Sequence, residues 1–159
     1  FMWAPWRMEY VSSPKSRKNI FLEKMNSDND RDSLVLFRGK YSFILMNLYP
    51  YNNGHILIVP YNKVKSLEDL SMNEVTEIMK LSQESMKIMR EVMKPEGFNL
   101  GLNQGKAAGA GIDEHLHFHI VPRWKGDNNF MPATGNTKVI VQALEDTYDI
   151  LLPEYNKIK

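Results

Sequence analysis

The sequence predicts an α+β fold in which an antiparallel five-stranded sheet is crossed by one long helix and closed by a C-terminal helix. Three observations predict it. Short apolar runs separated by turn residues fill positions 33–60, helical periodicity begins at Ser71, and apolar residues alternate with histidines in "HLHFHIV" (115–121). Such alternation indicates a strand with one buried face, because successive side chains of a strand point to opposite sides of the sheet.

The first three strands are expected in "SLVLFRGKYSFILMNLYP" (33–50) and "YNNGHILIVP" (51–60). The apolar runs in these segments are interrupted by "RGK" (38–40) and "NNG" (52–54), which are typical of tight turns. Turns this short join antiparallel neighbours, so the three strands are predicted to pair in sequence order.

A long helix is predicted to begin at Ser71, where "SMNE" fits a capping box completed by Glu74. The helix is expected to end before "PEG" (95–97). Its regular methionines are interpreted as core filler rather than as a ligand surface. The predicted buried face consists of Met72, Val75, Ile78, Met79, Ser82, Met86, Met89 and Met93.

The remaining elements complete the sheet. "FNLGLN" (98–103) is predicted to be the fourth strand, "QGKAAGAGIDE" (104–114) a loop of small residues, and "HLHFHIVP" (115–122) the fifth strand. An irregular connection over 123–137 is expected to lead to a closing helix over 138–155.

Length and composition predict one globular domain over 1–159 with N-terminal and C-terminal extensions, since 159 residues with 43% hydrophobic content can bury a core. Trp3 and Trp6 are expected to anchor the first extension by packing, and "SDNDRD" (27–32) to form a loop. With 20 basic and 19 acidic residues, neither a nucleic-acid polymer nor a membrane surface is an expected partner.

Two absences indicate the compartment. No apolar run approaches the roughly 20 residues of a membrane span, and no signal-peptide pattern is found. The chain has no cysteine, which removes disulfides, thiolate zinc sites and cysteine nucleophiles and is compatible with a reducing environment. A cytoplasmic location is therefore expected.

Three of the four histidines, His115, His117 and His119, are predicted to place their imidazoles on one face of the fifth strand. They could be ordinary hydrogen-bonded residues of a half-exposed strand. A neighbouring pair could bind zinc with Asp113 or Glu114, although the outer two histidines would be about 13 Å apart. Alternatively, one imidazole is a nucleophile toward phosphorus and another protonates the departing oxygen. Three histidines together favour a functional role over a structural one.

The loop "NQGKAAGAG" (103–111) favours chemistry at phosphorus. Gly105, Gly109 and Gly111 permit positive φ and close backbone approach, so that successive N–H groups can bind phosphate oxygens. A glycine-rich loop can also be a flexible connection, but this one stands directly before the histidine strand.

These residues resemble the histidine-triad family. "HLHFHIV" matches the motif His-φ-His-φ-His-φ-φ, where φ is apolar, and "NQG" (103–105) stands upstream like the family's polar-x-Gly. Asn47 and His55 are eight residues apart, as in the fragile-histidine-triad branch. "WAPWRMEY" and "VPRWKGDNNFMP" are similar to bacterial members related to diadenosine tetraphosphate phosphorylases and hydrolases. The resemblance covers nearly the whole chain.

The resemblance implies a role for each histidine. His117 would attack the α-phosphorus of a nucleotide and form a nucleotidyl-histidine intermediate, and His119 would handle the proton or charge of the leaving group. His115 and His55 would orient and polarise the set, and Asn47 would contact the ribose hydroxyls.

Phosphate binding is less sharply assigned by the resemblance. The "NxG" pattern selects Asn103 as the residue beside the bridging oxygens, whereas ungapped counting selects Gln104. Several relatives carry a serine or threonine where this chain has Gly111 and Ile112, so loop amides, including those of Gly109 and Gly111, would have to replace that hydroxyl.

The implied activity is cleavage of a phosphoanhydride in dinucleoside polyphosphates, by hydrolysis or by phosphorolysis. A nucleoside phosphoramidase, a non-catalytic nucleotide-binding or signalling module and a metal-dependent enzyme are the alternatives. The resemblance also implies a homodimer whose sheets join across the subunits. Relatives with zinc hold it through cysteines, so no structural zinc or other cofactor is expected here, except magnesium accompanying the polyphosphate.

Overall fold

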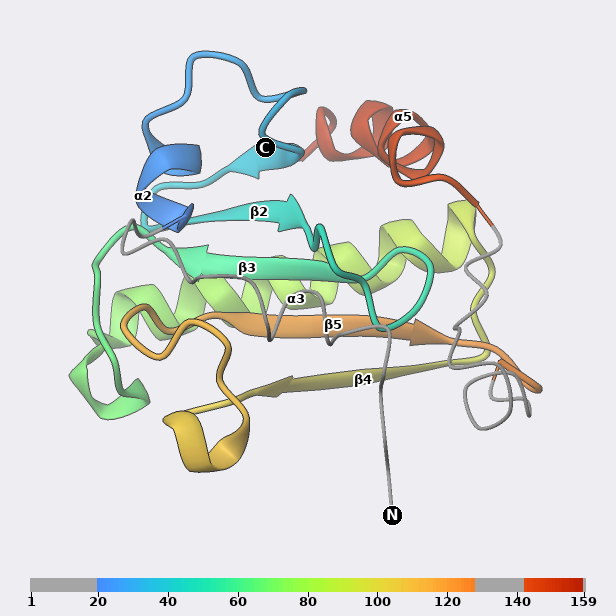
Figure 1. Cartoon of the computed structure of the whole chain (residues 1–159). Helices are drawn as coiled ribbons and strands as arrows, with labels where there is room; N and C mark the ends of the chain where they lie inside the picture. Colours follow the sequence, from blue (N-terminus) through green and yellow to red (C-terminus); the bar gives the residue numbers. More distant parts are fainter. Residues whose placement is uncertain (1–19, 128–141, 159) are drawn as a thin grey trace.

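A computed structural model of the chain describes residues 20–127 and 142–158 (Figure 1). Trp3, Trp6, the opening motif and most of the connection predicted after the fifth strand lie outside these residues. No helix within the described ranges is long and apolar enough to cross a membrane.

Five strands form one antiparallel sheet in the order β1-β2-β3-β5-β4, so the predicted fold class is confirmed. The first three strands are consecutive hairpin neighbours, and the last strand lies between β3 and β4 (Figure 1). β4 is therefore an edge strand, and three of its six residues are exposed while none is buried. The strands are β1 (Val35–Arg38), β2 (Ser42–Met46), β3 (Ile56–Pro60), β4 (Gly97–Leu102) and β5 (Phe118–Arg123).

The two faces of the sheet are covered differently. The long helix α3 (Met72–Val92) covers one face, where alternate strand residues such as Ile44, Ile58 and Ile120 join the larger hydrophobic core. The intervening residues, among them Leu45 and Leu57, face the other side and pack against the short helix α2 (Ile20–Met25). This division is the direct result of period-two alternation in the strands.

The capping box of α3 is confirmed, since the Ser71 amide donates to Glu74 at 2.7 Å and the Glu74 amide donates to the Ser71 hydroxyl at 3.4 Å. The predicted buried face is only partly correct. Met72 and Met79 are 74% and 37% exposed, because the buried stripe is rotated by roughly a quarter turn from the predicted one. Larger aliphatic side chains orient the helix, whose buried residues are Glu74, Ile78, Leu81, Ser82, Ser85, Ile88 and Met89.

The closing helix α5 (Leu144–Tyr155) packs on α3 and β1, and the Tyr148 hydroxyl donates to the Val35 carbonyl at 2.9 Å. The predicted helix covered 138–155, but α5 begins at Leu144, and residues 142–143 are not helical. Residues 138–141 lie outside the described residues. Short 3₁₀ turns occur at η2 (Leu67–Asp69) and, within the glycine-rich loop, at η3 (Lys106–Ala108).

The predicted fifth strand begins too early. The strand starts only at Phe118. Before it, the Leu116 amide donates to the carbonyl of Val64, in the segment that follows β3, at 2.8 Å rather than to a neighbouring strand. The alternation nevertheless continues through this segment, so Leu116 packs in the core beneath α3 while the histidines lie on the α2 face.

Candidate active site

All four histidines gather on the α2 face of the sheet. His55 stands immediately before β3, His119 lies on β5 opposite Leu57 of β3, and His115 and His117 precede β5. The rings of His117 and His119 are 4.9 Å apart and those of His55 and His119 are 5.2 Å apart, measured between centroids. The structure therefore brings together every histidine that the sequence singled out.

His117 has a defined tautomer. Its Nδ1 lies 2.9 Å from the carbonyl oxygen of His115. A carbonyl can only accept, so Nδ1 carries the proton and Nε2 keeps a lone pair. Burial lowers the pKa of the imidazole, against the weaker opposing effect of this hydrogen bond, so the ring is neutral at pH 7. A neutral imidazole whose other nitrogen is held as a donor is a competent nucleophile.

His115 is buried and held by a backbone carbonyl. Its Nε2 donates to the Pro60 carbonyl at 2.8 Å, and its side chain is completely buried. Burial is the main cause that lowers its pKa. Since His117 is only 6% exposed as well, a half-exposed strand with solvated histidines does not describe this site.

His55 and His119 form a directional pair. The Tyr51 amide donates to Nδ1 of His55 at 2.9 Å, so the proton of neutral His55 is on Nε2. That Nε2 lies 3.0 Å from Nδ1 of His119 and donates to it. In its neutral form His119 then carries its own proton on Nε2, which suits it to donate a hydrogen bond to an anion.

Asn47 supports the same pair. Its side-chain nitrogen is 3.3 Å from Nδ1 of His55, and its side-chain oxygen accepts from the Tyr49 amide at 3.0 Å. Asn47 also lines the cavity beside His117 and His119. Its contact with ribose hydroxyls remains a prediction.

The loop before β5 brings one of the two alternative phosphate-contacting residues to the cavity. Asn103 lines it together with Gly109 and Gly111. Gln104 is turned away, because its side chain accepts from the Leu67 amide at 3.0 Å and donates to Glu68 at 3.3 Å. The alignment on the "NxG" pattern thus agrees with the geometry, and ungapped counting does not.

The positive φ that the sequence allows for this loop is present at two of its three glycines. Gly105 and Gly109 have φ values of 80° and 87°. Gly111 does not have a positive φ, so its contribution is the absence of a side chain at the cavity wall. Ile112 packs against the hydrophobic cluster that contains Phe21 of α2.

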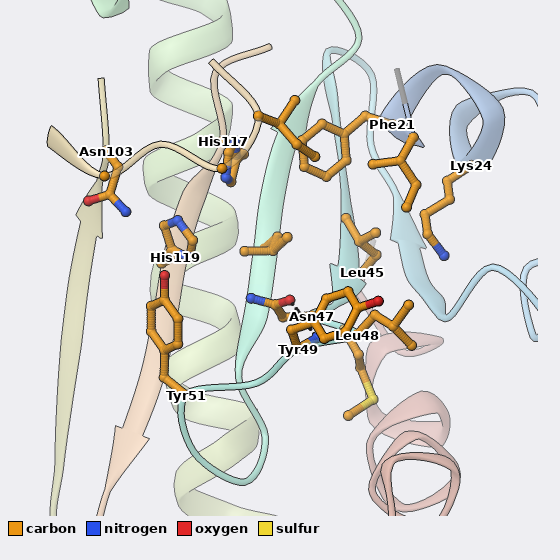
Figure 2. Close-up of a pocket in the computed structure, with 16 residues that line it drawn as sticks. Phe21, Lys24, Leu45, Asn47, Leu48, Tyr49, Tyr51, Asn103, His117 and His119 are labelled. Carbon is orange, nitrogen blue, oxygen red and sulfur yellow. Dashed lines mark hydrogen bonds between the residues drawn. The ribbon is translucent and has the colours of Figure 1, made fainter. Parts of the chain in front are cut away.

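The rest of the cavity wall is mostly apolar, as Figure 2 shows. Phe21 lies with its ring centroid 5.0 Å from that of His117 and 5.5 Å from that of His115. Asn103, His119 and Tyr51 stand at the β4 and β5 side of the cavity, opposite α2 (Figure 2). The apolar lining residues include Ile20, Phe21, Leu45, Leu57 and Ile112. A mostly apolar wall with a few converging polar groups is typical of sites for small organic ligands.

Sequence reasoning missed Phe21 and Tyr51. Phe21 belongs to α2, whose six residues are too short for a clear helical period, although the spacing of Phe21 and Met25 was a usable signal. Tyr51 stacks on His119 with ring centroids 5.7 Å apart, whereas the sequence pattern assigns it only a position before the predicted turn at 52–54. Its contact joins residues 68 positions apart in the chain.

The metal alternative has little geometric support in the part of the chain described. No group of three histidine, cysteine, aspartate or glutamate residues is arranged to hold an ion among residues 20–127 and 142–158. Asp113 pairs with Lys106 at 3.5 Å and Glu114 with Lys63 at 3.2 Å. Nε2 of His115 is a donor to a carbonyl and cannot also be a ligand.

Comparisons with known proteins agree with the fold and the motif. Residues 28–126 match the family model described as HIT domain. AP-4-A phosphorylase of Mycobacterium tuberculosis (strain ATCC 25618 / H37Rv) is 42% identical over 163 aligned positions, which cover 97% of this chain and 83% of the relative. Bis(5'-adenosyl)-triphosphatase of Dictyostelium discoideum is 35% identical over 97 positions, covering 61% of this chain and 64% of the relative.

Two solved structures have the same fold. A Zn-bound histidine triad family protein from Mycobacterium smegmatis has a TM-score of 0.67 at 20% identity, covering 87% of this chain and 91% of that one. Plasmodium falciparum diadenosine triphosphate hydrolase in complex with cyclomarin A has a TM-score of 0.63 at 26% identity, covering 80% and 76%. The chain belongs to the histidine triad family.

Proposed function

We propose that the protein cleaves a phosphoanhydride bond of dinucleoside polyphosphates such as diadenosine tetraphosphate, by way of a nucleotidyl intermediate on His117. The observation that carries this proposal is the neutral His117 ring, whose Nδ1 donates to the His115 carbonyl and whose Nε2 has a lone pair at the cavity. The names of relatives, AP-4-A phosphorylase and bis(5'-adenosyl)-triphosphatase, support the substrate class.

In the first step, Nε2 of His117 attacks the α-phosphorus of the bound nucleotide. A P–N bond forms as the bond to the bridging oxygen breaks, so diadenosine tetraphosphate leaves AMP on the histidine and releases ATP. His119, oriented by His55, donates toward the departing oxygen. The charge on the phosphoryl oxygens is stabilised by Asn103 and by the loop amides near Gly109 and Gly111.

In the second step, we propose inorganic phosphate as the acceptor. Its oxygen attacks the phosphorus of AMP-His117, the P–N bond breaks, and ADP leaves. The support is comparative: the relative named a phosphorylase is matched over 83% of its length. The relatives named bis(5'-adenosyl)-triphosphatase and bis(5'-nucleosyl)-tetraphosphatase match over only about 60% of this chain.

Further parts of the proposal concern binding, assembly and location. Asn47 contacts the ribose hydroxyls, and magnesium arrives with the polyphosphate rather than as a resident cofactor. Each chain folds as one domain and forms a homodimer through the exposed edge strand β4, with the two sheets continuing across the subunits. The absence of cysteine supports a cytoplasmic location.

Product analysis tests the function. Purified protein is incubated with diadenosine tetraphosphate, with and without inorganic phosphate, and the nucleotides are separated by anion exchange. ADP plus ATP formed only with phosphate is the expected result. ATP plus AMP in both samples would make the enzyme a hydrolase. No product in either sample would contradict cleavage of this substrate and favour a phosphoramidase or a nucleotide-binding module.

A further inference from the structure

A second hollow adjoins the cavity around His117, on the side away from α2. It has a volume of about 260 Å³ and shares Tyr51, Asn103 and His119 with the cavity. The hollow is not lined by His117. It extends over the edge strand and the neighbouring β5, and we call it the β4 trough. Its other lining residues are Asn99, Leu100, Gly101, Leu102, Val121 and Arg123.

The floor of the β4 trough is kept open by a glycine. Gly101 lies opposite His119 in the ladder, so both residues belong to the α2 face of the sheet. Within the described part of the chain, no atom lies within 4 Å of the position that a Cβ at Gly101 would occupy. Gly101 does not have a positive φ, so its backbone does not require glycine. The missing side chain therefore leaves space rather than permitting a turn.

The wall of the trough carries an oriented hydrogen-bond donor. Nη1 of Arg123 donates to the side-chain oxygen of Asn99 at 3.1 Å, which directs the Asn99 amide nitrogen away from the arginine. Arg123 is fixed in turn by two hydrogen bonds to Asp127, at 2.6 and 2.7 Å. Much of the guanidinium charge is balanced by that carboxylate. The trough thus combines an apolar lining, which includes Leu102 and Val121, with polar groups held in place by hydrogen bonds and without a strong net charge.

The position of the trough relative to the nucleophile decides what it can hold. In an in-line displacement the leaving group departs opposite the attacking atom. In the proposed function, a nucleotide with its base in the apolar cavity would present its α-phosphorus to Nε2 of His117, with His119 on the side of the leaving group. The rest of the molecule then continues past His119, which is where the β4 trough begins.

We infer that the β4 trough binds the leaving nucleotide of a dinucleoside polyphosphate, and that Gly101 and Asn99 determine selectivity for substrates with a second nucleotide. This inference rests on the proposed function. Gly101 leaves room for the polyphosphate and nucleoside, and Asn99 donates to one of their oxygens. A substrate with a small leaving group uses the same nucleophile but does not use the trough.

The test compares two substrates that give the same AMP-His117 intermediate. Diadenosine tetraphosphate has a nucleotide as its leaving group, and adenosine 5′-phosphorimidazolide has only an imidazole ring. Gly101→Val fills the floor of the trough. Asn99→Leu removes the amide donor two residues along β4 from Gly101, which is the residue paired with His119. Gly97→Val is the matched control, because this glycine lies on the same face of β4 outside the trough and a Cβ there meets only the Arg123 Cβ, at 4.0 Å.

We expect Gly101→Val and Asn99→Leu to lower kcat/KM for diadenosine tetraphosphate by about 10-fold or more, and to change it less than about 2-fold for the imidazolide. Gly97→Val should leave both values near wild type. Equal losses on the two substrates would overturn the inference, since the valine would then be disturbing His119. Unchanged kinetics on both would overturn it as well.

Failure of the proposed function would give a different result, in which the wild-type protein turns over neither substrate. Calorimetric binding then decides the role of the trough by itself. Tighter binding of diadenosine tetraphosphate than of AMP, with the difference lost in Gly101→Val, supports the β4 trough. Equal affinities for the two nucleotides in the wild-type protein overturn it.

Discussion

At the scale of single residues, the chemistry depends on which nitrogen of each imidazole carries the proton. In His117 that choice is made by a backbone carbonyl, and in His55 by a backbone amide. Both hydrogen-bond partners are main-chain groups of nearby residues, His115 and Tyr51. They do not titrate and are not removed when a side chain is substituted. The site therefore keeps its tautomers over the pH range in which the rings remain neutral.

His117→Ala should lower kcat/KM for diadenosine tetraphosphate by at least about 10³-fold, because no other side chain in the cavity can replace the Nε2 lone pair. Rapid denaturation at alkaline pH, where a P–N bond persists, should trap labelled AMP on the wild-type chain and not on the variant. Circular dichroism of the variant serves as the folding control. Turnover close to wild type would remove His117 as the nucleophile.

The free energy of unfolding should fall as the pH drops below about 6.5. Burial lowers the pKa values of His115 and His117 in the folded state, so below the ordinary value of 6.5 the unfolded chain binds more protons and is favoured. This stability is fully present above pH 6.5, and each group removes at most about 1.4 kcal/mol per pH unit below it. Urea unfolding at pH 7.5 and 5.5 measures the effect.

His115→Gln is the matched comparison for this pH dependence. Glutamine has an amide donor for the Pro60 carbonyl but does not titrate. We expect the variant to lose less stability than the wild type between pH 7.5 and 5.5. The same loss in both proteins would show that the buried His115 does not contribute to it.

At the scale of elements, the short helix α2 has an effect out of proportion to its length. Its Phe21 is 2% exposed and contacts both His115 and His117, so it is a main source of the burial that keeps these rings neutral. The helix contributes no polar group to the chemistry that we propose. Ile20 and Phe21 of this helix form part of the apolar cavity wall, and Phe21 shields His117 from water.

Phe21→Ala should move the acidic limb of the kcat/KM profile to higher pH, since water reaching His117 raises its lowered pKa toward the ordinary value. The substitution should also cost about 3–5 kcal/mol of stability. Phe21→Leu, which keeps much of the apolar volume, should restore most of the limb. NMR titration of the His117 ring checks the pKa directly, and an unshifted titration in Phe21→Ala would contradict this role.

The carboxylate of Glu77 on α3 connects the turn between β1 and β2 to this helix by hydrogen bonds. Glu77 accepts from the amides of Lys40 and Tyr41 at 2.8 and 2.7 Å and from the Ser42 hydroxyl at 2.8 Å. Glu77→Gln places an NH₂ group against donors, and we expect it to lower the free energy of unfolding by about 1–3 kcal/mol. The control is Glu84→Gln on the same helix, where an exposed ion pair is broken and the cost should be below about 1 kcal/mol. Denaturant midpoints that are equal for the two variants would contradict the fastening role.

At the scale of the whole molecule, the proposed homodimer makes a prediction about the exposed edge. Leu100 on β4 is 43% exposed and Ile150 on α5 is 44% exposed, so they are a matched pair of apolar surface positions. Leu100→Lys should shift sedimentation equilibrium from dimer toward monomer, because a charge at the edge strand opposes strand pairing. Ile150→Lys should leave the dimer unchanged. A wild-type monomer, or equal effects of both variants, would contradict assembly through β4.

The pairing of the first three strands and the face that carries the histidines were predictable because both depend on local patterns, whereas the place of β5 between β3 and β4 was not predicted. Hairpin turns at 38–40 and 52–54 determine neighbouring strands, and alternation in "HLHFHIV" places the histidines on one face. The start of β5 was not predictable, since the segment before Phe118 finds its hydrogen-bond partner at Val64, across a loop. The rotation of α3 depended in the same way on side-chain packing.

The sequence by itself determined the α+β class, the sheet face that carries the histidines, and His117 as the candidate nucleophile, because alternation and motif spacing depend on neighbours within a few residues. Only the tertiary structure decided that Asn103 rather than Gln104 reaches the cavity, that Phe21 covers His117, and that Gly101 opens a trough beside His119. The physical reason is that these contacts join residues tens of positions apart, and such pairs meet only when the strands have been placed side by side.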